Sequence, residues 1–253
     1  MVLLHGLVST GDIFGSTFDT LAETHQLVVP DLLGFGRSMD STRDAFSLAD
    51  HLDALDDLAD QHGLFDHRWT IGAHSMGSSL ALHWATRHAE RVDRIVCWGA
   101  PIHQSPVQAR RQIGGSSMAR LFALDDGLAE QACAISCRHR AAAGWMSSLA
   151  EPRLPVAVAR AASLHTWPAY RDAMRELVIE TPWRELILEL DERGVEISLV
   201  WGTEDHVGDR RAAREILTSC RNATITTVPG VDHHLPLSHP AVCVGHLVEK
   251  RSM

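Results

Sequence analysis

The stretch from Arg68 to Leu82 reads RWTIGAHSMGSSLAL, and the order of its residue types decides the fold. The apolar run Trp69–Ile71 leads into a cluster of small residues, and a sequence of helical character follows. This order predicts a strand, a sharp turn and a helix, with Ser75 at the turn. Such a turn needs small residues two positions before and after the serine, where Ala73 and Gly77 stand. Glycine is usual at both positions, so Ala73 adds one methyl group at the tightest point.

Ser75 has two interpretations at this stage. It is either the N-cap of a helix in an ordinary loop or a nucleophile held on a strained turn. The pattern Ala-x-Ser-x-Gly does not separate the two, because a nucleophilic serine also needs a base and an orienting acid. The order of the remaining motifs along the chain therefore has to decide between them.

Short apolar segments and helical patterns alternate around this turn. The predicted strands are Val2–Leu4, Leu27–Val29, Trp69–Ile71, Arg94–Trp98, Ile197–Trp201 and Ala223–Val228. The predicted helices are Leu48–His62, Ser78–Arg87, Arg211–Ser219 and a last one from Pro240. Mostly apolar strands that alternate with helices are typical of an α/β protein, with a mostly parallel sheet and helices on both faces.

The alternation stops between residues 102 and 190. This segment contains no convincing strand, and prolines punctuate a series of helical patterns. These patterns cover Ala119–Ala134, Val156–Leu164, Tyr170–Ile179 and Trp183–Glu192. We interpret residues 102–190 as a helical cap, inserted into a sheet domain that residues 1–101 and 191–253 form.

Composition limits the kinds of partner. The chain of 253 residues carries a formal charge of −9 at pH 7, so no basic face is available to bind nucleic acid. No apolar run approaches the roughly 20 residues that span a membrane, and the residues after Met1 do not form a signal peptide. We therefore expect a cytoplasmic protein with neither nucleic acid nor membrane as a partner.

The cysteines and histidines do not form a metal-binding pattern. The 5 cysteines are odd in number and lack the spacing of a disulfide framework. The 16 histidines are mostly scattered, and none has a metal-ligand spacing on a helix with a third ligand. Cys133, Cys137 and His139 form the nearest cluster, but a fourth ligand is missing and core packing explains them better. We expect no metal and no cofactor.

Five motifs in order along the chain carry a resemblance to a known family. They are His5-Gly6, DLLGFGRS at 31–38, AHSMG at 73–77, WGTEDHV at 201–207 and PGVDHHLPLSHP at 229–240. Together they resemble the landmarks of the α/β-hydrolase superfamily, in which the serine precedes the acid and the acid precedes the histidine. Within it, the chain is similar to capped esterases, meta-cleavage-product hydrolases and cofactor-free haloperoxidase-like enzymes. The resemblance covers essentially the whole chain except the cap.

The resemblance implies a catalytic triad and an oxyanion hole. It assigns the nucleophile to Ser75, the base to His233 and the orienting acid to Asp205. The backbone N–H groups of Leu7 and Met76 are then the donors to the developing oxyanion.

Neighbouring residues compete for two of these roles. Asp209 is a second carboxylate after the same strand as Asp205, although it lies further from the strand end. His234 and His239 follow His233, and the match of PGVDHHLP places His233 at the base position.

The cap is expected to cover Ser75 and to set the choice of substrate. The insert leaves the sheet at the carboxyl end of a strand, and Ser75 lies at another carboxyl end, on the edge where ligands bind. Large apolar residues are frequent in the insert, including Met118, Phe122 and Met146. The residues expected at the substrate pocket are His5, His74, Trp145, Trp167 and Trp183.

The start of the chain departs from the family pattern. The superfamily usually has two more strands before the His-Gly strand, and only four residues precede His5 here. The predicted strand Leu27–Val29 then becomes an open sheet edge, and an open edge is covered, charged or paired with another subunit. The N-terminal strands are therefore either missing or misassigned, or the protein forms a homo-oligomer through this edge.

The function expected from these residues is hydrolysis of a small or medium, mainly apolar ester-like substrate through a Ser-His-Asp triad. Two alternatives remain open. The same triad could serve a carbon–carbon bond hydrolase or another acyl-transfer enzyme, because the fold does not fix the substrate. A catalytically silent protein that holds a small-molecule ligand under the cap is the alternative from a different class.

Overall fold

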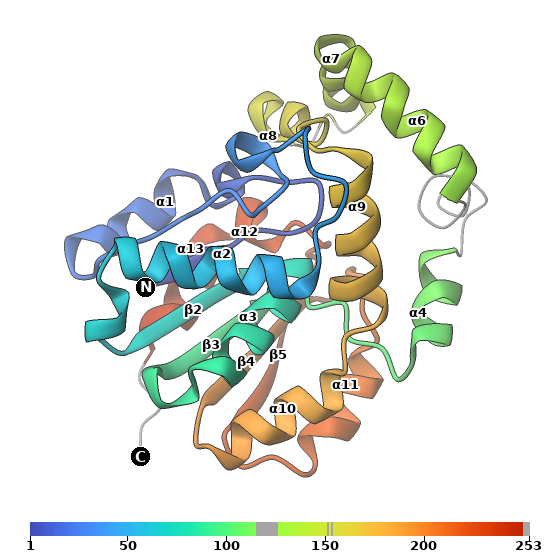
Figure 1. The fold of residues 1–253 in the computed structure, drawn as a ribbon. Coiled ribbons are helices and arrows are strands. Elements are labelled where there is room, and N and C mark those ends of the chain that lie inside the picture. Colours follow the sequence, from blue (N-terminus) through green and yellow to red (C-terminus); the bar gives the residue numbers. More distant parts are fainter. Residues whose placement is uncertain (115–125, 151, 153, 250–253) are drawn as a thin grey trace.

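The core of the molecule is a parallel sheet of five strands in the order β1-β2-β3-β4-β5 (Figure 1). The computed structural model describes residues 1–114, 126–150, 152 and 154–249. The strands are β1 (Val2–Leu4), β2 (Trp69–His74), β3 (Val92–Trp98), β4 (Glu196–Gly202) and β5 (Ala223–Val228). The predicted α/β fold with a parallel sheet is confirmed, and each of these strands contains or equals the segment predicted for it.

Helices cover both faces of this sheet. Successive strand residues point to opposite sides, so the apolar residues of the strands need cover on both faces. In β3, Ile95 and Cys97 enter one core cluster, whereas Val96 and Trp98 enter the other. The helices on the first face are α2 (Leu48–Gln61), α3 (Met76–Arg87), α10 (Trp183–Glu192) and α11 (Arg210–Leu217). Those on the second are α1 (Gly15–Asp19), α12 (Leu235–Ser238) and α13 (Pro240–Val248). Short 3-10 turns connect them at Gly11–Phe14, Thr20–Glu23, Gly36–Ser38, Leu64–Asp66 and Ala89–Arg91.

The predicted strand Leu27–Val29 is reduced to an isolated bridge between Val2 and Val28. The Leu3 N–H donates to the Val28 carbonyl at 2.9 Å, and the Val28 N–H donates to the Met1 carbonyl at 2.9 Å. Pro30 follows at once and has no N–H to extend the ladder. This segment still lies beside β1, at the edge where the sequence analysis placed it.

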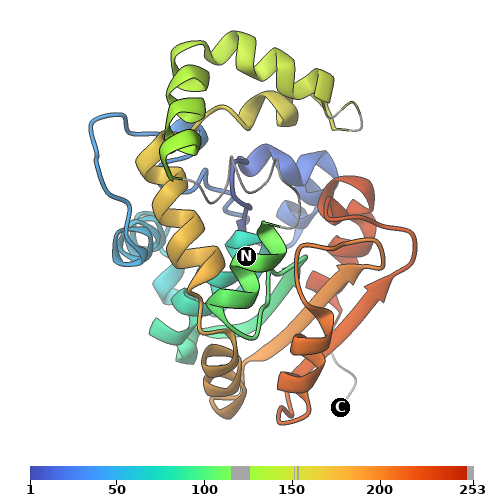
Figure 2. The same cartoon turned by 90° about the vertical axis from the view of Figure 1, so that its right-hand side faces the viewer.

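A layer of helices stands over one end of the sheet (Figures 1 and 2). Its members are α4 (Pro106–Ile113), α6 (Asp126–Arg138), α7 (Arg140–Ala150), α8 (Val156–Ala161), α9 (Trp167–Ala173) and the π-helix η6 (Met174–Ile179). Helix α7 is absent from the predicted set. Met118, Phe122 and the first part of the predicted helix Ala119–Ala134 lie outside the described residues.

Helix α10 lies within the segment 102–190 that we interpret as the cap, and it packs on the sheet rather than over its end. Leu186, Ile187 and Leu190 are buried in the same core cluster as Ile197 and Leu199 of β4. The amphipathic pattern of α10 identified a helix, but it could not show that its apolar face packs on the sheet.

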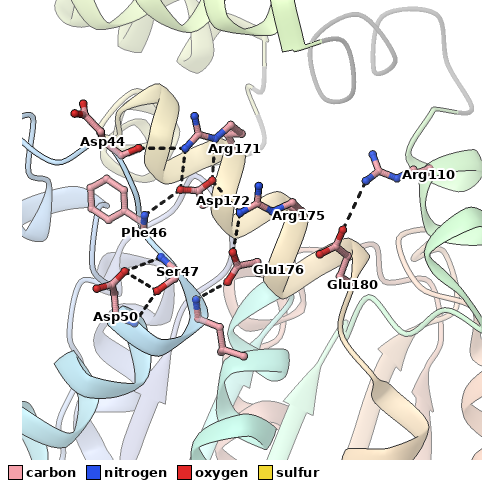
Figure 3. A network of polar contacts seen from close by, with 11 residues as sticks. Asp44, Phe46, Ser47, Asp50, Arg110, Arg171, Asp172, Arg175, Glu176 and Glu180 are labelled. Carbon is pink, nitrogen blue, oxygen red and sulfur yellow. Dashed lines mark hydrogen bonds and ion pairs between the residues drawn. The ribbon is translucent and has the colours of Figure 1, made fainter.

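A polar network joins the helical layer to the start of α2 (Figure 3). The Asp172 side chain is buried and accepts the Phe46 N–H at 2.9 Å, while Arg171 donates to its other oxygen at 2.8 Å. One turn later, Glu176 accepts the Leu48 N–H at 2.6 Å and satisfies a free donor at the N-terminus of α2. These contacts fix α9 and η6 against the sheet domain.

Asp172→Asn should lower the free energy of unfolding by about 2 kcal/mol, because it removes a charge from buried hydrogen bonds. Burial alone would raise the pKa of Asp172, but hydrogen bonds from Arg171 and Phe46 outweigh it and lower the pKa. The stabilisation is therefore complete above the usual aspartate pKa and is lost as pH falls through the lowered one. Thermal melts at several pH values check this: the gap between wild type and variant should close in acid. Asp53→Asn, at an exposed ion pair with Arg87, is the control and should change little.

Candidate active site

Ser75 lies on a strained turn between β2 and α3. Its backbone has φ 53° and ψ −123°, a conformation that a residue with a side chain rarely adopts. Gly77 permits this turn, because a Cβ atom there would lie 2.5 Å from the Leu4 carbonyl oxygen. Ala73, the other flanking residue, is buried in the core cluster on the α3 face. The turn presents Ser75 at the carboxyl end of the sheet.

Three side chains from different loops meet at this turn. The Nε2 atom of His233 lies 2.9 Å from Ser75 Oγ, and its Nδ1 atom lies 2.9 Å from Asp205 Oδ2. Asp205 follows β4 and His233 follows β5, so the parallel sheet brings both to the edge where β2 ends. The rival residues stand elsewhere: Asp209 caps α11, and the His234 ring lies 3.5 Å from Asp232.

The hydrogen bonds fix the protonation states of this trio. A carboxylate only accepts, so His233 Nδ1 carries the proton and Nε2 is free to accept from the Ser75 hydroxyl. Asp205 is 2% exposed. Burial would raise its pKa, but the hydrogen bond and charge of His233 and the Val207 N–H lower it below the usual range. A buried, ionised Asp205 is suited to stabilise an imidazolium at His233.

Gly99 makes room for this arrangement and is a residue that the sequence motifs did not indicate. It follows β3 with a positive φ of 61°. A Cβ atom there would lie 2.9 Å from Asp205 Oδ2 and 3.0 Å from His233 Nδ1. A glycine directly after a central strand was the available signal.

The loop after β1 approaches Ser75 from the other side. A Cβ atom at Gly6 would lie 3.0 Å from the Ser75 Cβ atom, so this loop and the serine turn are in close contact. Val8 has a positive φ of 49°, which is strained for a β-branched residue and was not foreseen. Leu7 and Val8 both line the cavity above Ser75. Met76 is buried at the first position of α3.

His5 and Asp31 hold this loop. His5 is fully buried; its Nδ1–H donates to the Gly6 carbonyl and its Nε2 accepts the Leu32 N–H, each at 2.8 Å. Burial lowers the pKa of His5 to about 4, so the ring is neutral. Asp31 accepts the N–H groups of Gly11 and Arg37 at 2.9 and 2.8 Å. The motifs at 5–6 and 31–38 therefore support each other, and His5 is not among the residues that line the cavity.

A cavity of about 380 Å³ lies between the sheet domain and the helical layer and contains Ser75. His74, His233 and His234 contribute polar groups on the sheet side, and no Asp, Glu, Lys or Arg of the described residues lines it. The wall on the side of the helical layer consists of small and aliphatic residues, namely Ser147, Ala150, Leu154, Val158, Ala159 and Ala162. The cavity is thus suited to an uncharged, mainly apolar ligand.

None of the three tryptophans predicted at the pocket lines this cavity. Trp145 is 57% exposed, with the Arg160 guanidinium 3.8 Å from its ring centre. Trp167 is half-buried and stacks on Tyr170. Trp183 is 2% exposed and packs in the sheet-domain core as part of α10. We expected these tryptophans at the pocket because they are large and apolar, but the packing of their helices places their side chains elsewhere.

Trp183→Ala should therefore cost stability and leave selectivity unchanged. Removal of a buried tryptophan costs about 3–5 kcal/mol, because it leaves a cavity in the core. The ratio of kcat/KM values across esters of increasing acyl length should match that of the wild type at a temperature where the variant is folded. A changed length profile would place Trp183 at the substrate after all.

The described residues contain no group of three or more His, Cys, Asp or Glu side chains that could hold a metal ion. The Sγ atoms of Cys133 and Cys137 lie 3.7 Å apart on one side of α6, and Cys137 donates to the His165 carbonyl. In the described part of the chain, no helix is both long and apolar enough to cross a membrane.

The fold and the site together define the class of protein. The family model of the alpha/beta hydrolase fold matches residues 1–240, and the chain belongs to this family. A solved esterase from Rhodococcus, RhEst1, has a similar fold, with a TM-score of 0.71 at 19% identity over 97% of this chain and 87% of that one.

The matches to curated relatives cover only part of each relative's length. The probable lysophospholipase BODYGUARD 4 of Arabidopsis thaliana is 21% identical over 255 residues, which covers 94% of this chain and 60% of that protein. A cis-3-alkyl-4-alkyloxetan-2-one decarboxylase of Shewanella oneidensis is 30% identical over 98 residues, or 38% of this chain and 30% of that protein. The chain spans less than a third of the length of several curated relatives that it matches.

Proposed function

We propose that this alpha/beta hydrolase is a serine esterase that cleaves small or medium, mainly apolar esters through an acyl-enzyme. The observation that carries the proposal is the continuous pair of 2.9 Å hydrogen bonds from Ser75 through His233 to Asp205, inside an apolar cavity. A serine hydroxyl is a poor nucleophile until a base takes its proton, and His233 is placed to do so.

In the first half of the reaction, Ser75 Oγ attacks the ester carbonyl carbon while its proton moves to His233 Nε2. Asp205 stabilises the imidazolium that results. The backbone N–H groups of Met76 and Leu7 donate to the oxyanion, and each such donor typically lowers the barrier by about 3 kcal/mol. The carbon–oxygen bond to the leaving alcohol then breaks, and His233 returns the proton to that oxygen.

In the second half, His233 takes a proton from a water molecule that attacks the acyl carbon. Collapse of the second tetrahedral intermediate breaks the bond to Ser75 Oγ, which recovers its proton from His233. The histidine is thus base and acid in turn, and the reaction needs no group beyond the triad, the backbone donors and water.

The nature of the substrate is inferred from the cavity. Its wall of alanines, Leu154 and Val158 offers apolar surface, and none of the described residues that line it carries a charged side chain of Asp, Glu, Lys or Arg. The names of two relatives, a probable lysophospholipase and an alkyl-substituted oxetanone decarboxylase, concern compounds with apolar chains. An acyl ester with an alkyl or ring substituent fits this lining better than a sugar or a charged acid.

A fluorophosphonate probe tests the proposal, because it reacts covalently with an activated serine. We expect one phosphonyl group per chain, on the peptide that contains Ser75, together with turnover of short p-nitrophenyl esters. Labelling without ester turnover would favour a carbon–carbon bond hydrolase or another acyl-transfer enzyme on the same triad. Absence of both would favour a ligand-binding protein without catalytic activity.

A further inference from the structure

His74 is a buried polar side chain to which the proposed reaction gives no task. It is the last residue of β2 and precedes Ser75 directly. The residue is buried, with 4% of its surface exposed. Its ring centre is 4.9 Å from that of His233. Its Nε2 atom lies 2.8 Å from the backbone carbonyl oxygen of His233.

The direction of this hydrogen bond follows from the chemistry of its partner. A carbonyl oxygen only accepts, so His74 Nε2 carries a proton and donates it. Burial, followed by the nearby charge of His233, lowers the pKa of His74 to about 3. The ring is therefore neutral at neutral pH, and its Nδ1 atom has a lone pair instead of a proton.

This neutral form leaves one nitrogen without a partner. His74 Nδ1 is buried and makes no hydrogen bond within the described residues. A Cβ atom at Gly6 would lie 3.1 Å from it, so the ring packs tightly against the loop after β1. An unpaired buried acceptor is unfavourable, and an apolar side chain at this position would avoid that cost. The hydrogen bond from His74 Nε2 to the His233 carbonyl is the interaction that compensates for this cost.

Hydrogen bonds tie the loop that carries His233 to the ends of two strands. Near its start, the Gly230 N–H donates to Thr203 and the Val231 carbonyl accepts the Glu204 N–H, which ties the loop to the end of β4. His74 ties the same loop to the end of β2, where Ser75 is located. His74 and Ser75 are therefore adjacent in the chain. Ser75 is the proposed nucleophile, and His74 makes the contact that holds the proposed base.

We propose that His74 is a positioning residue that acts through the backbone of His233. Its Nε2–H holds the His233 carbonyl and so fixes the ring of His233 between Asp205 Oδ2 and Ser75 Oγ. The inference rests on the proposed function for its catalytic consequence, whereas the positioning itself is a structural property. His74 would then have this positioning role in addition to lining the cavity.

Variants at residue 74 separate the donor from the packing. His74→Gln keeps a donor near the place of Nε2, because the glutamine nitrogen is at the same distance along the side chain. His74→Asn is also polar, but its nitrogen is one bond shorter and does not reach the His233 carbonyl. His74→Phe keeps a ring and removes both nitrogens. The control is His51→Phe in α2, which removes the ring nitrogens of another buried histidine, 1% exposed and without hydrogen bonds from its ring in the described residues.

Kinetics and proton NMR are the two measurements. The Asn and Phe variants should lower kcat for a short p-nitrophenyl ester by about tenfold to a hundredfold, the loss typical of a misplaced catalytic group, with little change in KM. The acid limb of the kcat/KM profile should move to lower pH, because Asp205 then stabilises the imidazolium less. The downfield resonance of His233 Nδ1–H should be lost in both variants. His74→Gln should retain the resonance and most of kcat.

The same experiment contains the results that would overturn the proposal. If His74→Asn and His74→Phe lose only thermal stability, as His51→Phe should, then His74 is a packing residue. If the Phe variant does not fold, the comparison of Asn with Gln decides, and equal behaviour of these two excludes a positioning donor. A wild-type protein that neither hydrolyses esters nor reacts with the probe would refute the proposed function, but the NMR signal would still test the positioning of His233.

Discussion

Ser75→Ala should abolish ester hydrolysis, with a fall in kcat on the order of 10⁶-fold, the size seen when a triad serine is removed. The variant keeps Asp205, His233 and the backbone donors, but no atom remains that can form the acyl-enzyme. Binding of a non-hydrolysable ester analogue should be unchanged, because the hydroxyl contributes little to the apolar cavity. Labelling by the fluorophosphonate probe should disappear with the activity.

The control for this substitution is Ser78→Ala, three residues further along α3. It removes the same atom from the same segment, where the Ser78 hydroxyl donates to the Ala73 carbonyl at 3.3 Å. It should retain the activity of the wild type and lose some stability, since a buried hydrogen bond is removed. Ester turnover by Ser75→Ala at a rate near that of the wild type would reject Ser75 as the nucleophile.

The sequence predicted the parts of the structure that local patterns determine. The small residues around Ser75, the positions of β1 to β5 and the order of the motifs depend on neighbours within a few residues. Because the strands are parallel, knowing that Ser75, Asp205 and His233 follow three of them is enough to expect that they meet. The structure brings these three side chains into hydrogen-bond contact, as the resemblance implied.

Features that depend on packing between distant segments were not predictable. Trp183 and Trp145 have the same side chain, yet one lies in the core and the other is 57% exposed, because their helices face different partners. Likewise, α10 is a regular amphipathic helix, and only its contact with β4 shows that its apolar face packs on the sheet. The hydrogen bond from His74 to the His233 carbonyl joins residues 159 positions apart, and no spacing in the sequence predicts it.

His233→Ala should reduce kcat/KM by about 10⁵- to 10⁶-fold, because the serine loses the base that activates it. His234 is the sharpest control available, since it is the adjacent residue and also lines the cavity. Its ring centre lies 6.1 Å from that of His233, and its Nδ1 atom lies 3.5 Å from Asp232, a carboxylate outside the triad. His234→Ala should therefore change kcat/KM by less than about tenfold, mainly through KM.

Added imidazole makes this comparison more specific. In His233→Ala, the space left beside Asp205 and Ser75 is that of an imidazole ring, so a free imidazole that enters it can accept the serine proton. We expect partial recovery of ester turnover that saturates with imidazole concentration, and no effect on Ser75→Ala or on His234→Ala. If His234→Ala instead shows the large loss and the imidazole rescue, the base is His234, and the hydrogen bonds from His233 to Ser75 and Asp205 do not describe the active form of the enzyme.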